Sequence, residues 1–387
     1  MSGESNFETI VIGLGAMGSA SLYQLAKKGN KVLGIDQFSP THQMGSTHGD
    51  TRITRQAIGE GREFVPLSLR SYEIWDELEK KSGNKLLTIT GGLILGNTAG
   101  NLLHGSSNFL QNTIDAAVEW NIPHKLFSAG ELRRRFPQFH IEDSYIGYYE
   151  EKAGFLRPEL CIQTQIDLAK QYGAQINLNE KVHQFIPVAD RAVEVITDKG
   201  VYNARKVIIS AGPWISHFFP EYAQLFKVYR QVLYWFDIQG SVTPFLPENF
   251  PIFILVGNGA NGIYGFPAID GPHGGIKVAF EEYSTETTPE NINREISKEE
   301  ISRAYHKYIS KHLPTLKNKC LKAIACLYTQ TTDSKFIIDT HHENSQIIIA
   351  SPCSGHGFKH SAAIGEALSE LAIDGKSHLN LDAFKVE

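Results

Sequence analysis

The stretch ETIVIGLGAMG, residues 8–18, decides the fold class of this chain. Its first five residues are mostly β-branched and are followed at once by glycine, which predicts a short buried strand. Residues 19–28 carry apolar side chains at helical spacing, and KVLGID, residues 31–36, predicts a second strand. A strand, a helix and a second strand in this order form the unit from which Rossmann-type sheets are built.

The three glycines of this stretch each have a physical task in dinucleotide binding. Gly13 permits a tight turn, Gly15 lets the backbone approach a pyrophosphate, and Gly18 allows the helix to pack closely on the strand. The helix N-terminus then presents N–H groups to the phosphates. Asp36 ends the second strand, where a carboxylate accepts hydrogen bonds from ribose hydroxyls. A dinucleotide site is therefore predicted. A purely structural glycine turn is the alternative, and the motif leaves NAD and FAD both open.

Composition narrows the classes of partner. The 387 residues, 42% of them hydrophobic, suffice for two domains or one large one, because a single core stops growing near ~250–300 residues. The net charge of −5 and the pI near 6.3 provide no basic face for nucleic acid or for an anionic membrane. No window approaches the ~20 apolar residues of a membrane span. Small molecules are the expected partners.

The cysteines and the N-terminus indicate the compartment. Cys161, Cys320, Cys326 and Cys353 show no C-x-x-C spacing, which argues against a zinc site and against a disulfide framework. The first residues are acidic and polar, whereas a secretory signal begins with basic and then apolar residues. We therefore expect a cytoplasmic protein without a metal.

The remaining pattern predicts two interleaved domains. Apolar spacing predicts helices within 62–82, 102–120, 153–172 and 360–373, and a charged, largely helical stretch over 283–312. Strands are predicted at 86–95, 175–178, 192–197, 206–212 and 347–350. Residues 226–282 are rich in aromatic residues and alternate in polarity, with Arg230 as a polar exception, which predicts an antiparallel sheet.

Several further motifs resemble one family. They are GSTHGDTRITR (45–55), GEGREFVPL (59–67), YGFP (264–267), CLYT (326–329), FIID (336–339) and SGHGFK (354–359). Together with the glycine motif and the last helix, they resemble the monomeric sarcosine oxidase and N-methyltryptophan oxidase family in order and over residues 9–375. This family consists of FAD-dependent amine oxidases of the D-amino-acid-oxidase-like superfamily.

The resemblance implies an α/β (α+β) two-domain fold, in which a Rossmann-type FAD-binding domain is interleaved with an antiparallel-sheet substrate domain. The FAD-binding domain is expected to comprise residues 1–90, 150–225 and 320–387, and the substrate domain residues 91–149 and 226–319. The resemblance also implies a monomer.

The resemblance assigns residues to the cofactor. Cys326 matches a cysteine that attaches to the flavin through a thioether; an ordinary buried cysteine is the alternative. Cys353 is expected to serve packing. The expected cofactor-binding residues are Gly13, Gly15, Gly18, Asp36, Ser46, Thr51, Arg52, Val182, Ala211, Gly212, Trp214, Cys326, Gly355, Gly357, Phe358 and Lys359.

The resemblance also assigns residues to the reaction. Arg55 and Lys359 match two cations that hold the substrate carboxylate, a task for which a guanidinium fork and an ammonium are suited. Lys277 matches a lysine that promotes the reaction with oxygen, where a fixed cation stabilises developing negative charge. The other catalytic candidates are Arg52, Tyr264 and His48.

One position departs from the family pattern. Sarcosine oxidases carry a histidine where this chain has Glu281, so the charge of the pocket differs. Glu281 is expected to bind the substrate ammonium, to pair with Lys277, or to turn outward. The segment GFLRPEL (154–160) is more similar to N-methyltryptophan oxidases, which favours a bulkier substrate.

We therefore expect an FAD-dependent oxidase of secondary, N-methyl amino acids, of the sarcosine oxidase or N-methyl-L-tryptophan oxidase type. It would use O2 and release hydrogen peroxide. A pipecolate or other cyclic imino acid oxidase, or a dehydrogenase that passes electrons to a carrier, is an alternative. From other classes, an NAD-dependent dehydrogenase and a catalytically silent flavoprotein remain to be considered.

Overall fold

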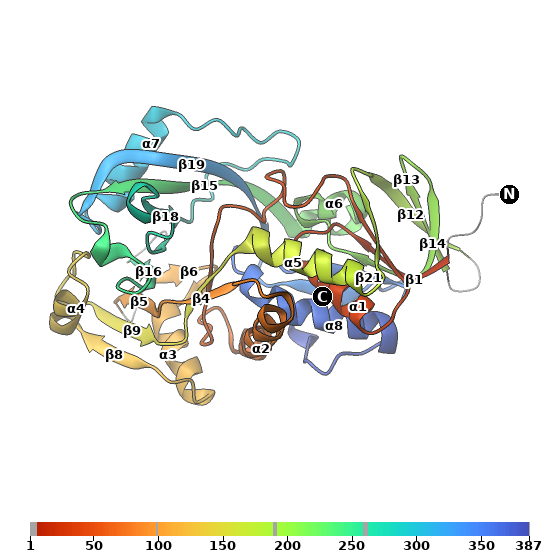
Figure 1. The fold of residues 1–387 in the computed structure, drawn as a ribbon, viewed down its shortest axis with the longest axis horizontal. Helices are drawn as coiled ribbons and strands as arrows, with labels where there is room; N and C mark the ends of the chain where they lie inside the picture. Colours follow the sequence, from red (N-terminus) through yellow and green to blue (C-terminus); the bar gives the residue numbers. More distant parts are fainter. Residues whose placement is uncertain (1–5, 98–99, 189–191, 258–261, 387) are drawn as a thin grey trace.

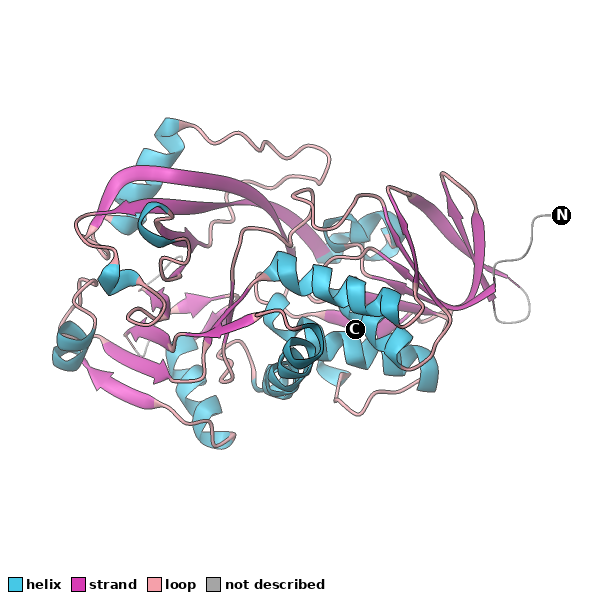
Figure 2. Cartoon of the chain, viewed as in Figure 1, coloured by secondary structure: helices cyan, strands magenta, loops and turns pink. Residues whose placement is uncertain are grey.

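The computed structural model describes residues 6–97, 100–188, 192–257 and 262–386 (Figure 1). Two eight-stranded sheets form its framework. Helices lie mainly beside the first sheet, and the longest strands belong to the second (Figure 2).

The first sheet contains the predicted βαβ unit. Its order is β11-β2-β1-β14-β13-β12, and β21 pairs with β14 and with β20. The pairs β1–β2, β1–β14, β2–β11 and β14–β21 are parallel. Its strands are β1 (Asn6–Ile12), β2 (Val32–Asp36), β11 (Gln175–Leu178), β12 (Val182–Val188), β13 (Ala192–Thr197), β14 (Val201–Ile209), β20 (Ile337–Thr340) and β21 (Ile347–Ser351).

Four helices pack beside this sheet and against one another: α1 (Ala16–Lys27), α2 (Val65–Ser82), α5 (Pro158–Gln171) and α8 (Ser361–Asp374). Helices α1 and α8 approach closely because Gly365 has no side chain; an added Cβ there would lie 2.4 Å from the Cβ of Ala20. The first and last helices of the chain thus share one core.

The second sheet has the order β19-β15-β18-β17-β16-β5-β9-β8 and is antiparallel except for the parallel pair β5–β16. The long strands β15 and β19 run side by side (Figure 1). Its strands are β5 (Gly92–Gly96), β8 (Lys125–Ser128), β9 (Ile146–Glu150), β15 (Phe226–Ile238), β16 (Ile252–Val256), β17 (Ile263–Gly265), β18 (Ile276–Phe280) and β19 (Leu316–Thr331).

Smaller elements join the two sheets. A three-stranded sheet has the order β3-β10-β4, and β6 and β7 form a hairpin. These strands are β3 (Arg52–Thr54), β4 (Leu87–Ile89), β6 (Leu102–Leu103), β7 (Ser106–Ser107) and β10 (Gly154–Leu156). The remaining α-helices of the described residues are α3 (Phe109–Glu119), α4 (Ala129–Arg135), α6 (Ile215–Phe218) and α7 (Lys298–Ala304).

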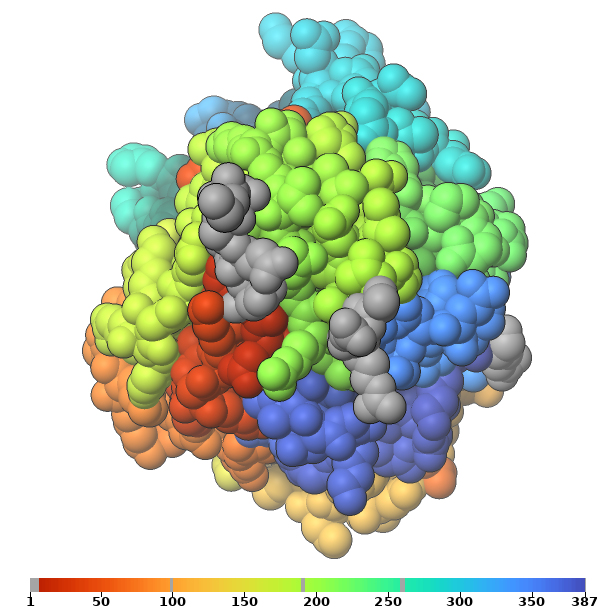
Figure 3. All heavy atoms as spheres, turned by 90° about the vertical axis from the view of Figure 1, so that its right-hand side faces the viewer, coloured from red at the N-terminus to blue at the C-terminus, as the bar shows by residue number. Residues whose placement is uncertain are grey.

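The predicted fold class is confirmed: a Rossmann-type sheet is interleaved with a largely antiparallel one. Segments distant in the sequence meet on one face, where Figure 3 shows N-terminal residues beside residues of the middle and of the C-terminal part of the chain. Among the helices of the described residues, none combines the length and the apolar character needed to cross a membrane.

Two predicted elements near the start of the second sheet are wrong in extent. The strand predicted over 86–95 is two strands in different sheets, because Gly91 turns the chain at φ +74°. The helix predicted over 102–120 begins only at Phe109. Its first part is the β6–β7 hairpin, which turns through His104 and Gly105 at φ +47° and +75°.

The segment predicted as largely helical over 283–312 is also different. Residues 283–297 are irregular, followed by α7 and a π-helical turn over Tyr305–Ile309. Arg230 on β15 explains why this segment lies extended: its guanidinium donates to the carbonyls of Asn293 and Glu295 and pairs with Glu300 at 2.6 Å. These contacts satisfy backbone groups that a helix would have bonded internally.

Candidate active site

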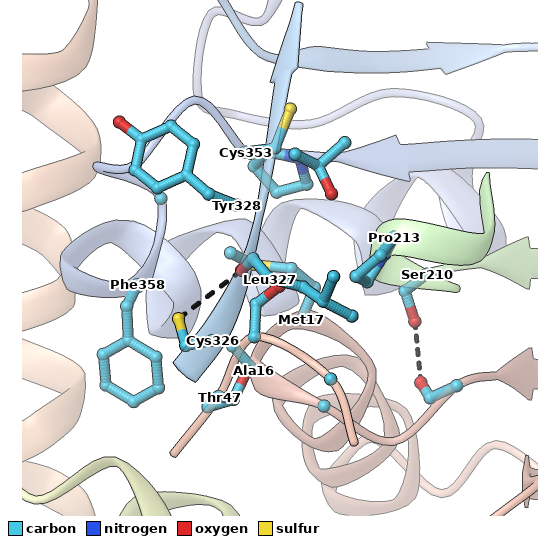
Figure 4. Close-up of a pocket in the computed structure, with 18 of the residues that line it drawn as sticks. Ala16, Met17, Thr47, Ser210, Pro213, Cys326, Leu327, Tyr328, Cys353 and Phe358 are labelled. Carbon is cyan, nitrogen blue, oxygen red and sulfur yellow. Dashed lines mark hydrogen bonds between the residues drawn. The ribbon is translucent and has the colours of Figure 1, made fainter. Parts of the chain in front are cut away.

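A cavity of about 500 Å³, the central cavity, lies where the two large sheets meet. Most residues predicted for the site line it. Figure 4 shows Cys326, Leu327 and Tyr328 along β19 together with Ala16 and Met17 at the start of α1. The predicted residues that line it are Gly13, Gly15, Asp36, Ser46, Thr51, Arg52, Arg55, Val182, Ala211, Gly212, Trp214, Tyr264, Lys277, Cys326, Gly355, Gly357, Phe358 and Lys359.

The glycine loop, residues 13–18, forms one end of this cavity. Gly13 has φ +85°, a region that favours glycine. A Cβ added to Gly18 would lie 1.7 Å from the carbonyl oxygen of Gly13, so this glycine serves packing and not contact with a ligand. At Gly15 the nearest atom to an added Cβ is Thr47 Oγ1, at 3.7 Å. The open side of Gly15 thus leaves room for a group bound against the backbone.

Asp36 closes the same end of the cavity. Its carboxylate accepts hydrogen bonds from the backbone N–H of Leu14 at 2.7 Å and of Phe38 at 2.8 Å. It therefore joins the end of β2 to the glycine loop. Each carboxylate oxygen keeps a second lone pair that can face the cavity.

Cys326 lies on β19 at the cavity wall and is 7% exposed. Its thiol contacts the carbonyl of Leu327 at 3.6 Å, which the dashed line beside Cys326 marks in Figure 4. Burial raises the pKa of this thiol, and the nearby cations Arg52 and Lys277 oppose the shift. Cys353, expected to serve packing, is half-buried and also lines the cavity.

The side chains of Arg52 and Lys277 both donate to backbone carbonyls of the segment 46–51. The Arg52 guanidinium donates to the carbonyls of Thr51 at 2.9 Å and Ser46 at 2.8 Å. The Lys277 ammonium donates to the carbonyls of Gly49 at 2.7 Å and Thr51 at 2.9 Å. Burial, and then Arg52, hold the pKa of Lys277 well below its usual value.

His48 belongs to the same loop but differs from the other catalytic candidates. It is buried and is not among the described residues that line the central cavity. Burial, assisted by the charge of Arg52, lowers the pKa of His48 to about 3. The imidazole is therefore neutral at pH 7.

Arg55 and Lys359 meet at a carboxylate of the chain itself. Glu60 lies 2.5 Å from Arg55 Nη2 and 3.2 Å from Lys359 Nζ. Burial would raise the pKa of Glu60, but Arg55 and Lys359 outweigh it and hold this pKa well below its usual value. Burial lowers the pKa of Lys359 to about 8, against the opposing effect of Glu60. The two cations therefore already enclose one carboxylate group.

Glu281 neither contacts Lys277 nor turns outward, and it is not among the described residues that line the cavity. Instead it pairs with His104 Nε2 at 2.6 Å, while His104 Nδ1 lies 3.2 Å from Glu60. Burial would lower the pKa of His104, but Glu281 and then Glu60 outweigh it and raise this pKa to about 9. His104 is thus a buried cation between two carboxylates.

Tyrosines surround this arrangement. The hydroxyls of Tyr283 and Tyr328 donate to Glu281 at 3.0 and 3.2 Å. Tyr264 on β17 lines the cavity, and burial raises its pKa. The hydroxyls therefore remain protonated donors at neutral pH.

Glu60 and His104 were not predicted as site residues. Glu60 lies within one of the family-like motifs, which was the only available signal for it. His104 lies in the segment predicted as helix, and nothing in the local pattern marks it. Together, Arg55, Glu60, His104, Glu281 and Lys359 form the charge cluster. Among the described residues, no group of His, Cys, Asp and Glu side chains could hold a metal ion.

Comparisons with known proteins show which family the chain belongs to. A family model described as FAD dependent oxidoreductase matches residues 8–371. Monomeric sarcosine oxidase from Streptomyces avermitilis is 38% identical and covers 95% of this chain and 94% of its own. N-methyl-L-tryptophan oxidase from Yersinia pestis is 34% identical, over 98% of this chain and 99% of that protein. The structure of NikD, an unusual amino acid oxidase of nikkomycin biosynthesis, superposes with a TM-score of 0.84 at 19% identity, over 99% of this chain and 98% of that one.

Proposed function

This chain belongs to the family of FAD-dependent oxidoreductases, and from this premise we propose that it oxidises the C–N bond of secondary, N-methyl amino acids. In the overall reaction an N-methyl amino acid, O2 and water give the primary amino acid, formaldehyde and hydrogen peroxide. Membership in this family also decides between FAD and NAD, which the glycine motif left open.

The observation that carries the proposal is the convergence of Arg55 and Lys359 on one carboxylate at the cavity. In the structure this carboxylate is that of Glu60. We infer that the substrate carboxylate takes its place beside Arg55 and Lys359, because two carboxylates cannot share two cations without strong repulsion. The amine would then point into the central cavity, towards Tyr264 and Arg52.

The residues present fit FAD. The backbone beside Gly15 is open, and Gly212, at φ +54°, has no atom within 4 Å of an added Cβ. FAD, when bound, accepts two electrons from the substrate and passes them to O2. The glycine loop and Asp36 would hold its nucleotide, Thr51 and Arg52 would lie at its ring, and Phe358 would complete the wall.

The remaining site residues would act by binding the substrate, by keeping water from it and by stabilising charge. Arg55 and Lys359 would orient the substrate and keep its carboxylate desolvated, and Tyr264 would donate a hydrogen bond. Lys277 would promote the reaction with O2, since a cation held near developing negative charge stabilises it. His48 and Glu281 would act through neighbouring residues, His48 as a neutral group and Glu281 through His104.

We propose further that Cys326 attaches to the flavin. The expected test is to precipitate the purified protein with acid: flavin should stay in the pellet with the native chain and move to the supernatant with Cys326→Ser. Flavin in the native supernatant would contradict the attachment. Cys161→Ser is the matched control, because Cys161 is buried outside the central cavity.

Substrate is identified by anaerobic reduction. We expect sarcosine or N-methyl-L-tryptophan to bleach the bound flavin, with saturation that depends on Arg55. Bleaching by L-pipecolate alone would favour a cyclic imino acid oxidase, and a flavin that none of the three reduces would contradict the proposal.

The remaining proposals concern organisation. The division into residues 1–90, 150–225 and 320–387 against 91–149 and 226–319 stays a prediction, and β19 runs across its boundary at residue 320. We also propose a cytoplasmic monomer, to be tested by fractionation and by sedimentation.

A further inference from the structure

Glu159, in the first turn of α5, contacts the backbone of the 49–51 turn. Its Oε1 accepts from the N–H of Gly49 at 2.6 Å and of Asp50 at 3.1 Å. Both residues lie at positive φ, +100° for Gly49 and +70° for Asp50. A non-glycine residue in this region is strained unless its surroundings hold it there. Glu159 supplies that restraint by binding two consecutive N–H groups.

The same turn holds Lys277 on its other side. The ammonium donates to the carbonyls of Gly49 and Thr51 and to Thr51 Oγ1, the last at 3.1 Å. Aromatic rings cover it elsewhere, with Phe266 and Trp235 at 4.5 and 5.5 Å from its nitrogen. The position of the ammonium therefore follows the position of the two carbonyls, because the rings offer no directional acceptor.

We propose that Glu159 is the positioning residue of Lys277. It binds the N–H groups of the 49–51 turn, whose carbonyls bind Lys277, and so determines the position of the ammonium. The proposal rests on the function proposed above for Lys277. Glu159 itself does not line the central cavity; it lines a second cavity, together with Lys85 and Arg157. Its effect on the reaction with O2 is thus exerted through the backbone of the turn.

The negative charge of Glu159 also acts on the Lys277 ammonium. The titratable groups that interact with Lys277 are Arg52 on β3, Asp50 in the turn, Cys326 on β19, Glu159 on α5 and the neutral His48 of the same loop. Burial lowers the pKa of Lys277 most and Arg52 lowers it further, whereas Asp50 and Glu159 oppose this. Asp50 is engaged by Lys322 at 2.6 Å. Removal of the Glu159 charge is therefore expected to make the Lys277 ammonium a stronger acid.

The test uses two substitutions that separate restraint from charge. Glu159→Ala removes the acceptor and the charge, whereas Glu159→Gln keeps an acceptor oxygen. Asp167→Ala and Asp167→Asn are matched controls, because Asp167 is an exposed acid on the same helix whose described hydrogen bond is to Gln163. Lys277→Met serves as the benchmark for the step with O2.

Two readouts are expected to change together. In the oxidised holoenzyme, amide hydrogen exchange at Gly49 and Asp50 should become at least roughly tenfold faster in Glu159→Ala, the usual effect of losing a hydrogen bond to a charged group. In the holoenzyme, reoxidation of the reduced flavin by O2 should slow by roughly tenfold or more, with anaerobic reduction by substrate within about twofold of native. In Glu159→Gln, reoxidation should decline at lower pH than in the native enzyme.

The outcomes are distinguishable. Unchanged amide exchange or unchanged reoxidation in Glu159→Ala would overturn the inference, as would equal effects in the Asp167 controls. If Glu159→Ala does not fold, an unshifted pH profile in Glu159→Gln overturns it. If Lys277→Met reoxidises at the native rate, the proposed role of Lys277 fails, whatever the exchange data show.

Discussion

The glycine loop and the charge cluster lie at the same cavity, but backbone groups form the first and charged side chains form the second. The glycine loop is made of backbone: an added Cβ on Gly18 would meet Gly13 at 1.7 Å, whereas the side of Gly15 is open. The charge cluster is made of buried ionised side chains that satisfy one another. The first region is ready to receive a ligand as it stands. In the function proposed above, the second exchanges the internal carboxylate of Glu60 for that of the substrate.

The largest expected effect comes from removing Arg55. In Arg55→Met, the Glu60 carboxylate stays buried with one cation fewer beside it. Removal of one partner from a buried pair lowers the free energy of unfolding by about 3 kcal/mol. Chemical denaturation should show this loss, and kcat/KM should fall by roughly 100-fold for an N-methyl amino acid. Arg70→Met is the control, because Arg70 forms a comparable pair with Glu366 at 2.7 Å but its side chain is 26% exposed. Equal losses in the two variants would contradict the role of burial.

The glycine loop should separate into a packing position and a binding position. Gly18→Ala is expected to destabilise the flavin-free protein by about 2 kcal/mol, because the methyl group has no room. Gly15→Ala is expected to leave the flavin-free protein within about 0.5 kcal/mol of native and to weaken flavin retention. Thermal unfolding with and without flavin checks both. Similar unfolding of the two flavin-free variants would remove the distinction.

The charge cluster should respond to pH through His104. Its folded pKa, about 9, exceeds the unfolded value, so its charge stabilises the protein fully below about pH 6.5. This contribution is lost as the pH rises towards 9. We expect the free energies of unfolding of native protein and His104→Gln to differ by about 3 kcal/mol at pH 6 and to converge near pH 10. His273→Gln, at an exposed site, should show no such convergence.

The smallest effect is expected at the edge of the charge cluster. Tyr283→Phe removes a hydroxyl that donates to Glu281 at 3.0 Å. The free energy of unfolding should fall by about 1.5 kcal/mol, because the acceptor is charged and buried. Tyr72→Phe, whose hydroxyl donates to the exposed carbonyl of Lys152, should cost about 0.5 kcal/mol. Denaturation curves of the two variants measure the difference. A larger loss for Tyr72→Phe would contradict the assignment.

Much of the glycine-loop region could be predicted because its determinants are local. The steric demand on Gly13 and the β-branched run before it act within a few residues, so the βαβ unit follows from the sequence. Prediction failed where one or two residues changed the local geometry: Gly91 divided a predicted strand, and the turn at His104 and Gly105 replaced the first part of a predicted helix.

The charge cluster could be predicted only in part. Arg55, Lys359 and Glu281 were singled out by resemblance, but their partners were not. The partner of a buried charge is chosen by which side chains the fold brings within about 3 Å, and sequence spacing holds no record of that distance.

The sequence by itself thus determined the class of fold and the glycine loop, because backbone sterics and hydrophobic periodicity act at short range. The residues expected at the site came from the resemblance to a family. Only the tertiary structure decided that Glu60 stands between Arg55 and Lys359, that Glu281 pairs with His104, and that Glu159 restrains the turn beneath Lys277. The physical reason is that electrostatic pairing depends on separation in space, and burial makes that pairing obligatory for charges that the fold takes out of water.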